Sequence, residues 1–409
     1  MKNNTSKRWG FASYDFSNSG YVAVFQSFLF PIVLSDVLAR DGVASELIWP
    51  IMVSISSVLA VVTAPFIGRL ADQIGKTRVF TVLVLLTGLL AIVAPAAFSG
   101  AAALFVVSFV IFNLLFELSQ SIYDSFLLNL SKDPIEMTKI SSFAWGFGYL
   151  GGALFAVIYF VLSKAQVPPS AMLSIFAALF LLCSLPAIRF FSRLHIPPTR
   201  QEGSPLSDVL HPRTPVPWRE ILIYWVIADT VAAIMYFAPL YLRSELEMTT
   251  TMIGGVLLVG QLIAFPATIL MGHFASRIGN VRALQIGLVV WGVGLVGLFL
   301  ATSLVHVIVV FLLLSLVVGS TQALLRAHFA ERVSIEQSAE GLGFFAIAQK
   351  SASIVAPLIV VFTTIVWDSV APAFLVLALL IVIALIASSR LPSIRLREIR
   401  PERAHNALK

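Results

Sequence analysis

The sequence predicts an all-α membrane protein with twelve transmembrane helices in two pseudo-symmetric six-helix bundles. Apolar residues make up 58% of the 409-residue chain, charged residues only 12%, and the mean hydropathy is +0.94, so there are too few charges to cover a soluble surface. Apolar runs long enough to cross about 30 Å of hydrocarbon recur along the chain, and they exceed the roughly 10-residue alternating segments of a membrane β-barrel. A short polar hinge also occurs once in each half, at residues 68–78 and 272–282.

Each predicted span is an apolar run bounded by polar, glycine-containing or proline-containing turns. A helix satisfies its own backbone hydrogen bonds, which hydrocarbon requires. The first run is long, contains polar residues and follows a polar start with Lys2, Lys7 and Arg8, so we expect an uncleaved span rather than a signal peptide. The predicted spans cover residues 10–39, 46–71, 79–99, 101–130, 139–164, 170–191, 218–242, 251–276, 283–302, 304–330, 338–366 and 369–389.

A proline-rich polar segment divides the spans into two groups of six. It covers about residues 192–217 and contains six prolines, as expected of a flexible linker. We therefore predict an amino-terminal bundle (1–191), a cytoplasmic linker (192–217), a carboxy-terminal bundle (218–390) and a cytoplasmic tail (391–409). Transporters built from such repeats bind substrate near the midplane, at the interface between the repeats.

The distribution of basic residues predicts the orientation. With the amino terminus inside, 23 of the 27 lysines and arginines fall on the cytoplasmic side, so both termini should be cytoplasmic. We expect the protein in the plasma (inner) membrane. The net charge of +6 follows from this bias and does not indicate nucleic-acid binding. The only cysteine is Cys183, so no intrachain disulfide can form.

The hinge is the most specific motif. Its first copy, residues 68–78, reads GRLADQIGKTR, and its second, residues 272–282, reads GHFASRIGNVR; two glycines and the final arginine recur 204 positions apart. The glycines allow two helix ends to approach and turn tightly, and Asp72 can accept hydrogen bonds from a helix amino terminus. Lys76 and Arg78 can pair with acids or lipid phosphates, or act only in setting the topology.

The chain resembles the major facilitator superfamily of transporters. The first hinge matches that family's signature between helices 2 and 3, although Gln73 stands where the family has a basic residue and Ser276 replaces the aspartate in the second copy. Four further segments resemble the branch that includes vacuolar amino-acid effluxers: YDFSNS (14–19), WGFGYLGG (145–152), QALLR (322–326) and GFF (343–345). The resemblance implies alternating access and makes the hinges candidate gates, with these residues: Gly68, Asp72, Gly75, Lys76, Arg78, Gly272, Arg277, Gly279, Arg282 and, at the end of helix 10, Arg326.

A polar stripe in the fourth span is the main candidate site. Asn113, Glu117, Gln120 and Asp124 are spaced by four, three and four residues, which places them on one helix face. Each acid costs about 3 kcal/mol at the centre of a membrane helix, so such residues line a cavity or pair with a partner. Glu117 is nearest to mid-membrane, where burial favours the neutral acid, so it is a candidate proton carrier; the alternative is a fixed structural pair.

Three further ionisable residues fall inside spans. Lys350 in the eleventh span needs a carboxylate, which a helix 4 acid or an anionic substrate could supply, and Gln349 adjoins it. Asp229 could couple protons, bind a substrate amine or make a structural hydrogen bond, and Asp15 could line the cavity or act at its cytoplasmic end. Polar and aromatic residues that could contact a small solute, or only pack, are Gln26, Tyr21, Trp145, Tyr149, Tyr236, Gln261 and Gln322.

These features favour a secondary transporter, and we find no enzyme, metal or cofactor motif. We expect proton-coupled efflux of a small polar metabolite such as an amino acid, by a monomer in contact with membrane lipids. The alternatives are an importer of a small organic solute or a non-transporting sensor, although the soluble segments are too short to form a sensor domain.

Overall fold

The computed structural model describes residues 2–40, 45–98, 100–194, 196–198, 218–244, 248, 250–350 and 371–391, with isolated positions between 359 and 369. All regular elements in these ranges are helices. Most of the predicted linker, the carboxy-terminal tail from 392 and residues 351–358 of the eleventh predicted span lie outside the described residues.

Ten of the described helical segments are long and apolar enough to cross a membrane. The helix boundaries agree with the predicted spans to within five residues, except that the first helix begins eight residues early, at Lys2, and the eleventh span is described continuously only as far as Lys350. The ninth and tenth spans, for example, are α10 (Asn280–Phe299) and α11 (Leu304–Ala330). Two predicted spans are helical without being among the ten: α8 (Trp218–Ser244) and the eleventh span, which is described as α12 (Ser338–Lys350). The protein is thus a multi-pass integral membrane protein, whereas the number twelve stays a prediction.

The chain forms two compact units, and neither is one sequence half. Unit 1 comprises Met1–Leu130, Phe147–Pro217 and Arg332–Ser351, and unit 2 comprises Ser131–Gly146, Trp218–Glu331 and Ala352–Lys409. Each unit therefore contains a helical segment from the other half of the sequence: α12 in unit 1 and the start of α6 (Pro134–Lys164) in unit 2. The domain boundary expected at 192–217 remains a prediction.

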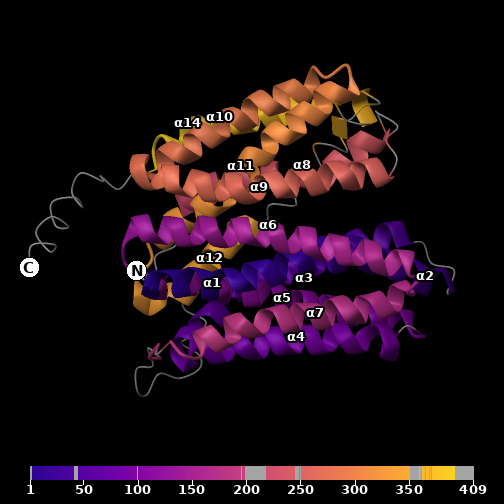
Figure 1. The fold of residues 1–409 in the computed structure, drawn as a ribbon, viewed down its shortest axis with the longest axis horizontal. Helices are drawn as coiled ribbons and strands as arrows, with labels where there is room; N and C mark the ends of the chain where they lie inside the picture. Colours follow the sequence, from indigo (N-terminus) through magenta and orange to yellow (C-terminus); the bar gives the residue numbers. More distant parts are fainter. Residues whose placement is uncertain are drawn as a thin grey trace, which may run out of the picture. The chain divides into compact units, whose positions relative to one another are not determined.

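Unit 1 packs its helices around an aromatic core. Within this unit, α12 lies against α3 and α5, and α4 lies against α5 and α7 (Figure 1). Tyr14, Phe80, Tyr123 and Phe191 are buried together, with Tyr14 and Tyr123 ring centroids 4.7 Å apart. The remaining helices of this unit are α1 (Lys2–Gly20), η1 (Tyr21–Leu29), α2 (Phe30–Arg40), α3 (Ser45–Ile74), α4 (Lys76–Phe98), α5 (Ala102–Leu130), α7 (Pro169–Phe191) and the later part of α6.

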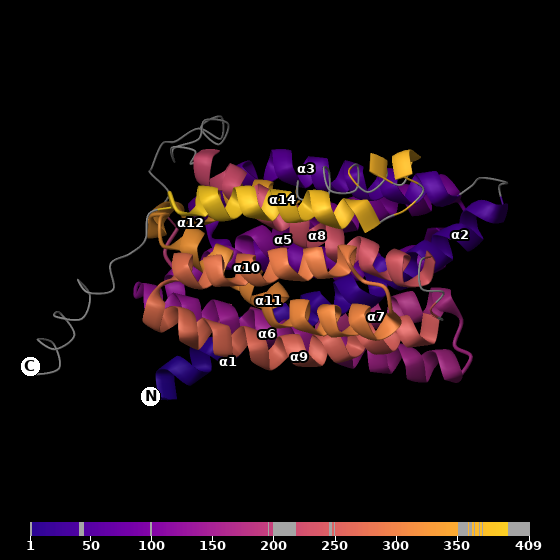
Figure 2. The ribbon, with the colours of Figure 1, turned by 90° about the horizontal axis from the view of Figure 1, so that it is seen from above.

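Unit 2 contains α8, α9 (Thr250–Ile278), α10, α11 and α14 (Ala371–Ser388), together with the first turns of α6. In this unit α10 packs against both α11 and α14, and α11 also packs against α9 (Figure 2). Trp291 of α10 is buried, and its indole nitrogen donates to the Thr321 hydroxyl of α11 at 3.1 Å.

The two hinge glycines end their helices in the same way. Gly75 follows α3 with φ +111°, and Gly279 follows α9 with φ +95°, and these are the only glycines with positive φ in the described ranges. Glycine adopts this backbone region without steric cost, whereas other residues do not. A Cβ added at either position would have no neighbouring atom within 4 Å, so the backbone angle alone requires glycine there.

Candidate functional site

The polar stripe of α5 is buried within unit 1. Asn113, Glu117 and Asp124 are 1%, 9% and 8% exposed, so the helix face identified by spacing points into protein. Glu117 lies next to the midpoint of the 29-residue helix. A carboxylate so placed needs a compensating charge.

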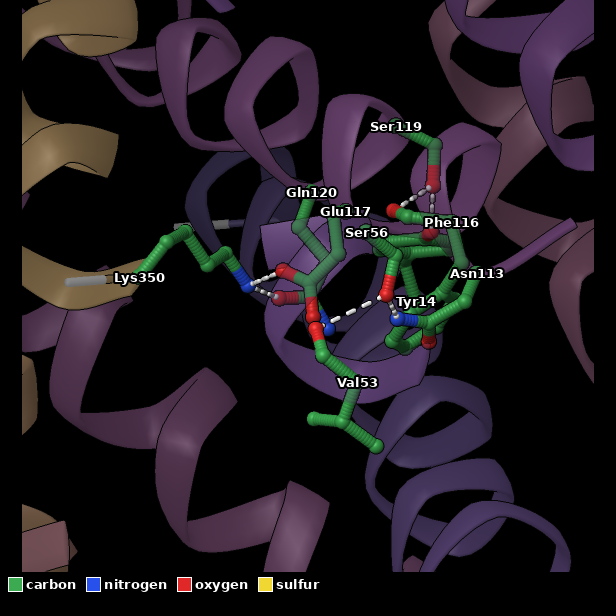
Figure 3. A network of polar contacts seen from close by, with 9 residues as sticks. All are labelled: Tyr14, Val53, Ser56, Asn113, Phe116, Glu117, Ser119, Gln120 and Lys350. Carbon is green, nitrogen blue, oxygen red and sulfur yellow. Dashed lines mark hydrogen bonds and ion pairs between the residues drawn. The ribbon is translucent and has the colours of Figure 1, made fainter. Parts of the chain in front are cut away.

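Lys350 supplies that charge. Its ammonium forms an ion pair with the Glu117 carboxylate and donates to the Gln120 side-chain oxygen at 2.8 Å. Figure 3 shows Lys350 reaching from α12 toward both acceptors on α5. The side chains keep 15% (Lys350) and 10% (Glu117) of their surface accessible, so the pair is not sealed off completely. The residues suggested by the sequence as partners are therefore in contact.

Other hydrogen bonds connect the same helix, α5, to the neighbouring helices α3 and α1. The Asn113 amide donates to Ser56 of α3 at 2.7 Å, and Ser56 in turn donates to the Val53 carbonyl at 3.0 Å (Figure 3). Ser56 also donates to the Met52 carbonyl at 3.0 Å. The Tyr14 hydroxyl of α1 and Ser119 of α5 are 2.5 Å apart. These contacts fix the orientation of α5 and hence of its acidic face.

The first hinge binds the start of α12. Both oxygens of Asp72 accept from the Ala339 backbone N–H, at 3.1 and 3.2 Å, and one also accepts from the Glu340 N–H at 3.0 Å. A carboxylate there is favoured by the partial positive charge of a helix amino terminus. Gly68 allows the approach, since a Cβ on it would overlap the Ala339 carbonyl oxygen. The predicted hydrogen bonding of Asp72 to a helix amino terminus is present.

Lys76 completes the first hinge with neutral partners. Its ammonium donates to the Asn129 side-chain oxygen at the end of α5 and to the Ser338 hydroxyl at the start of α12, both at 2.6 Å. The side chain is 4% exposed. Arg78, by contrast, is exposed, as are Arg277 and Arg282 of the second hinge, which fits a role in topology for these three.

The second hinge uses different groups within unit 2. A Cβ on Gly272 would overlap the Ser142 Cβ, so α6 approaches here as α12 approaches Gly68 in unit 1. Asn280 accepts from the Thr138 hydroxyl at 2.9 Å and donates to Glu331 at 2.6 Å. Ser276, in the position of Asp72, donates only to the His273 carbonyl of its own helix at 2.6 Å.

Arg326 is a buried structural contact of unit 2. It is 1% exposed, donates to the Ser141 hydroxyl at 2.9 Å and to the Ser141 carbonyl at 3.0 Å, and lies 5.5 Å from the Trp145 ring centroid. The guanidinium thus connects α11 to the start of α6. Sequence spacing gave no sign of Ser141, Glu331 or Thr138, because their partners lie far away in the chain.

The remaining candidate site residues lie on several different helices. Tyr21 is fully buried, packed against Phe25, Phe116 and Phe180 rather than facing open space. Asp15 is 5% exposed and accepts from Asn18 at 3.3 Å, and Asp229 of α8 is 2% exposed. The side chain of Tyr236 lies outside the described residues. The remaining polar and aromatic candidates are partly exposed: Gln26, Tyr149, Gln261, Gln322 and Gln349.

The long apolar helices indicate a membrane protein. Each of the two hinges also contacts a helical segment from the other half of the sequence, an arrangement typical of the transporter class. The chain belongs to the Major Facilitator Superfamily, whose sequence profile matches residues 17–266 and 221–408.

Individual relatives agree with this assignment. An uncharacterized MFS-type transporter of Bacillus subtilis, YxiO, is 24% identical over 96% of each chain. Autophagy-related protein 22-1 of Aspergillus fumigatus is 23% identical over 63% of this chain and 48% of its own length, so the chain resembles the branch named from its motifs. The fold is similar to that of the proton:xylose symporter XylE, with a TM-score of 0.77, 12% identity and 96% of each chain covered.

Proposed function

We propose that the chain is a proton-coupled secondary transporter that moves a small polar metabolite by alternating access. The observation that carries this proposal is the Glu117–Lys350 ion pair, which connects a helix of the first sequence half to one of the second. Protonation of Glu117 removes its charge and leaves the Lys350 ammonium without an anion in a low-dielectric setting, which is costly. A proton at this position therefore changes the energy of the contact between α5 and α12.

The first hinge supports a gating role for the same two helices. Asp72 and Lys76 hold the beginning of α12, while Glu117 holds its end at Lys350. One short helix thus has a contact sensitive to protonation at one end and a hinge contact at the other. We propose that α12 transmits the protonation state of Glu117 to the gate.

Efflux of an amino acid is the working proposal for substrate and direction. It rests on the resemblance to the branch that includes vacuolar amino-acid effluxers. We propose a monomer in the plasma membrane with both termini in the cytoplasm, since that orientation satisfies the distribution of basic residues.

The test is flux in proteoliposomes supplied with a metabolite mixture, with and without a pH gradient. The wild-type protein should show solute flux that responds to the gradient. Glu117→Gln should retain solute exchange but lose its dependence on the gradient, because a neutral side chain cannot carry the proton. Asp36→Asn, which alters an exposed acid of α2 outside the network, is the matched control and should behave as wild type.

Two outcomes count against the proposal. Unchanged proton dependence in Glu117→Gln removes Glu117 from the coupling role. Solute binding without any flux in the wild-type protein favours a sensor over a transporter.

A further inference from the structure

We propose that Lys350 binds a carboxylate of the transported solute, and that Glu117 takes up a proton when the solute displaces it. Solute and proton are then carried together rather than in exchange. This inference rests on the proposed function, and it adds a substrate class and the sign of the coupling.

The Lys350 ammonium has one more hydrogen-bond donor than it has acceptors among the described residues. An ammonium has three N–H donors, and the described residues give Lys350 two acceptors, the Glu117 carboxylate and the Gln120 amide oxygen. Its side chain is 15% exposed. Figure 3 shows the ammonium at the end of the long Lys350 side chain, which reaches from α12 to α5. The lysine stem is flexible, so the ammonium can be repositioned without movement of the backbone.

The charge balance around Lys350 links solute binding to protonation. Lys350 is the one cation in contact with Glu117 among the described residues. A solute carboxylate at Lys350 would place two anions beside one cation, which favours protonation of Glu117. Conversely, a protonated Glu117 leaves Lys350 unneutralised and raises its affinity for a carboxylate.

The other charged and titratable groups around the ion pair lie on α5 itself and on the elements packed against it. Asp124 is seven residues along α5, about 10 Å away at the helical rise. Lys76 contacts Asn129, twelve residues from Glu117, so the charges of the first hinge lie about 18 Å away along the same helix. The groups with described side chains on these elements are Lys7, Arg8, Tyr14, Asp15 and Tyr21 (α1 and η1), Asp36 and Arg40 (α2), Arg69 and Asp72 (α3), Lys76 and Arg78 (α4), Tyr123 (α5) and Glu340 (α12).

Reciprocal linkage gives the sign and the size of the coupling. If a proton strengthens carboxylate binding by some factor, the carboxylate strengthens proton binding by the same factor, which for coupled sites is about 5- to 150-fold. Two ligands that stabilise the same state cross the membrane in the same direction. An inward proton gradient then drives uptake, and the efflux proposed above occurs only where the outward driving force on the solute exceeds the inward driving force on the proton. The net charge moved is that of the solute plus one.

The experiment compares solutes that differ only in the carboxylate. Thermal stabilisation of the purified wild-type protein is measured with lactate against lactamide and L-leucine against L-leucinamide, at mildly acidic and mildly alkaline pH. A ligand that binds only the folded protein raises its melting temperature. At least one carboxylate should bind about 5- to 150-fold more tightly at acidic pH, whereas its amide should show no such change. This comparison needs no variant.

The variants assign the effect to the two residues. Glu117→Gln should bind the carboxylate tightly at both pH values. Lys350→Gln should no longer bind the carboxylate. Asp36→Asn should retain the wild-type pH dependence. The double variant Glu117→Gln with Lys350→Gln carries no uncompensated charge, so it provides a check where a single variant fails to fold.

The outcomes separate this inference from the proposed function. Carboxylate binding that ignores pH, or that survives in Lys350→Gln, overturns the inference. Proton-coupled flux of a solute without a carboxylate also overturns it while leaving the transporter proposal intact. Carboxylate binding with the expected pH dependence but without flux supports this inference and contradicts transport.

Discussion

Asp72→Asn tests the first hinge most directly. The carboxylate accepts from two backbone N–H groups at the start of α12, those of Ala339 and Glu340. The amide keeps one acceptor oxygen but loses the charge, which weakens each of the two hydrogen bonds by about 1 kcal/mol. Loss of the favourable interaction between the charge and the helix dipole costs up to about 1 kcal/mol more. Release of α12 should therefore become easier by about 2–3 kcal/mol, or about 30- to 150-fold in its equilibrium constant.

Thiol labelling can measure this release. Ser338 is fully buried beside the hinge, so a cysteine there in a Cys183→Ser background reacts only when α12 detaches. Where opening is fast, the labelling rate follows the open population. Detergent-solubilised Asp72→Asn should label about 30- to 150-fold faster than its parent. Arg78→Gln, which changes an exposed residue of the same hinge, should label at the parent rate. Equal rates in Asp72→Asn and its parent would refute the reasoning.

Three further perturbations have defined outcomes. Gly68→Val should also accelerate labelling, because the Cβ of the valine would overlap the Ala339 carbonyl. An unchanged rate would show that α3 shifts to accommodate the valine without release of α12. Gly75→Ala should lower stability by about 1–2 kcal/mol through its backbone angle alone, seen as a lower melting temperature, since no atom obstructs the methyl group. Arg326→Gln should destabilise the protein by about 2–3 kcal/mol, because charged hydrogen bonds to Ser141 are lost; a melting temperature equal to wild type would contradict this.

Much of the architecture could be predicted because hydrocarbon imposes simple rules. A span needs a long apolar run and internally satisfied backbone, and both can be recognised in one stretch of sequence. The spacing of the α5 stripe was sufficient to identify its buried face, and a lone lysine in a span was sufficient to require a carboxylate. The sequence left two sources for that carboxylate, an acid of the fourth span or an anionic substrate, and the structure contains the ion pair of Lys350 with Glu117.

The parts that could not be predicted depend on which distant segments meet. Local spacing gives no sign that α12 belongs to the compact unit of the first half, or that Asn280 contacts Thr138. The nine-residue π-helix η1 was missed for a related reason, since its sequence has the same apolar character as an α-helical span. Tyr21 lies in this π-helix and is fully buried. The sequence could not show this, because aromatic residues at helical spacing can face either a cavity or a packed interior.

The absence of an aspartate from the second hinge does not remove charge from unit 2. In unit 1 the charged contacts to the start of α12 come from the hinge itself, through Asp72 and Lys76. In unit 2 the hinge offers only the neutral Thr138–Asn280 bond to α6, whereas the charged contact comes from Arg326, one helix away. Hydrogen bonds to charged groups contribute about 1.5–3 kcal/mol and neutral ones about 0.5–1.5 kcal/mol. The start of α6 is therefore held by α11 more than by the second hinge, so substitutions at Ser276 should matter less for gating than substitutions at Asp72.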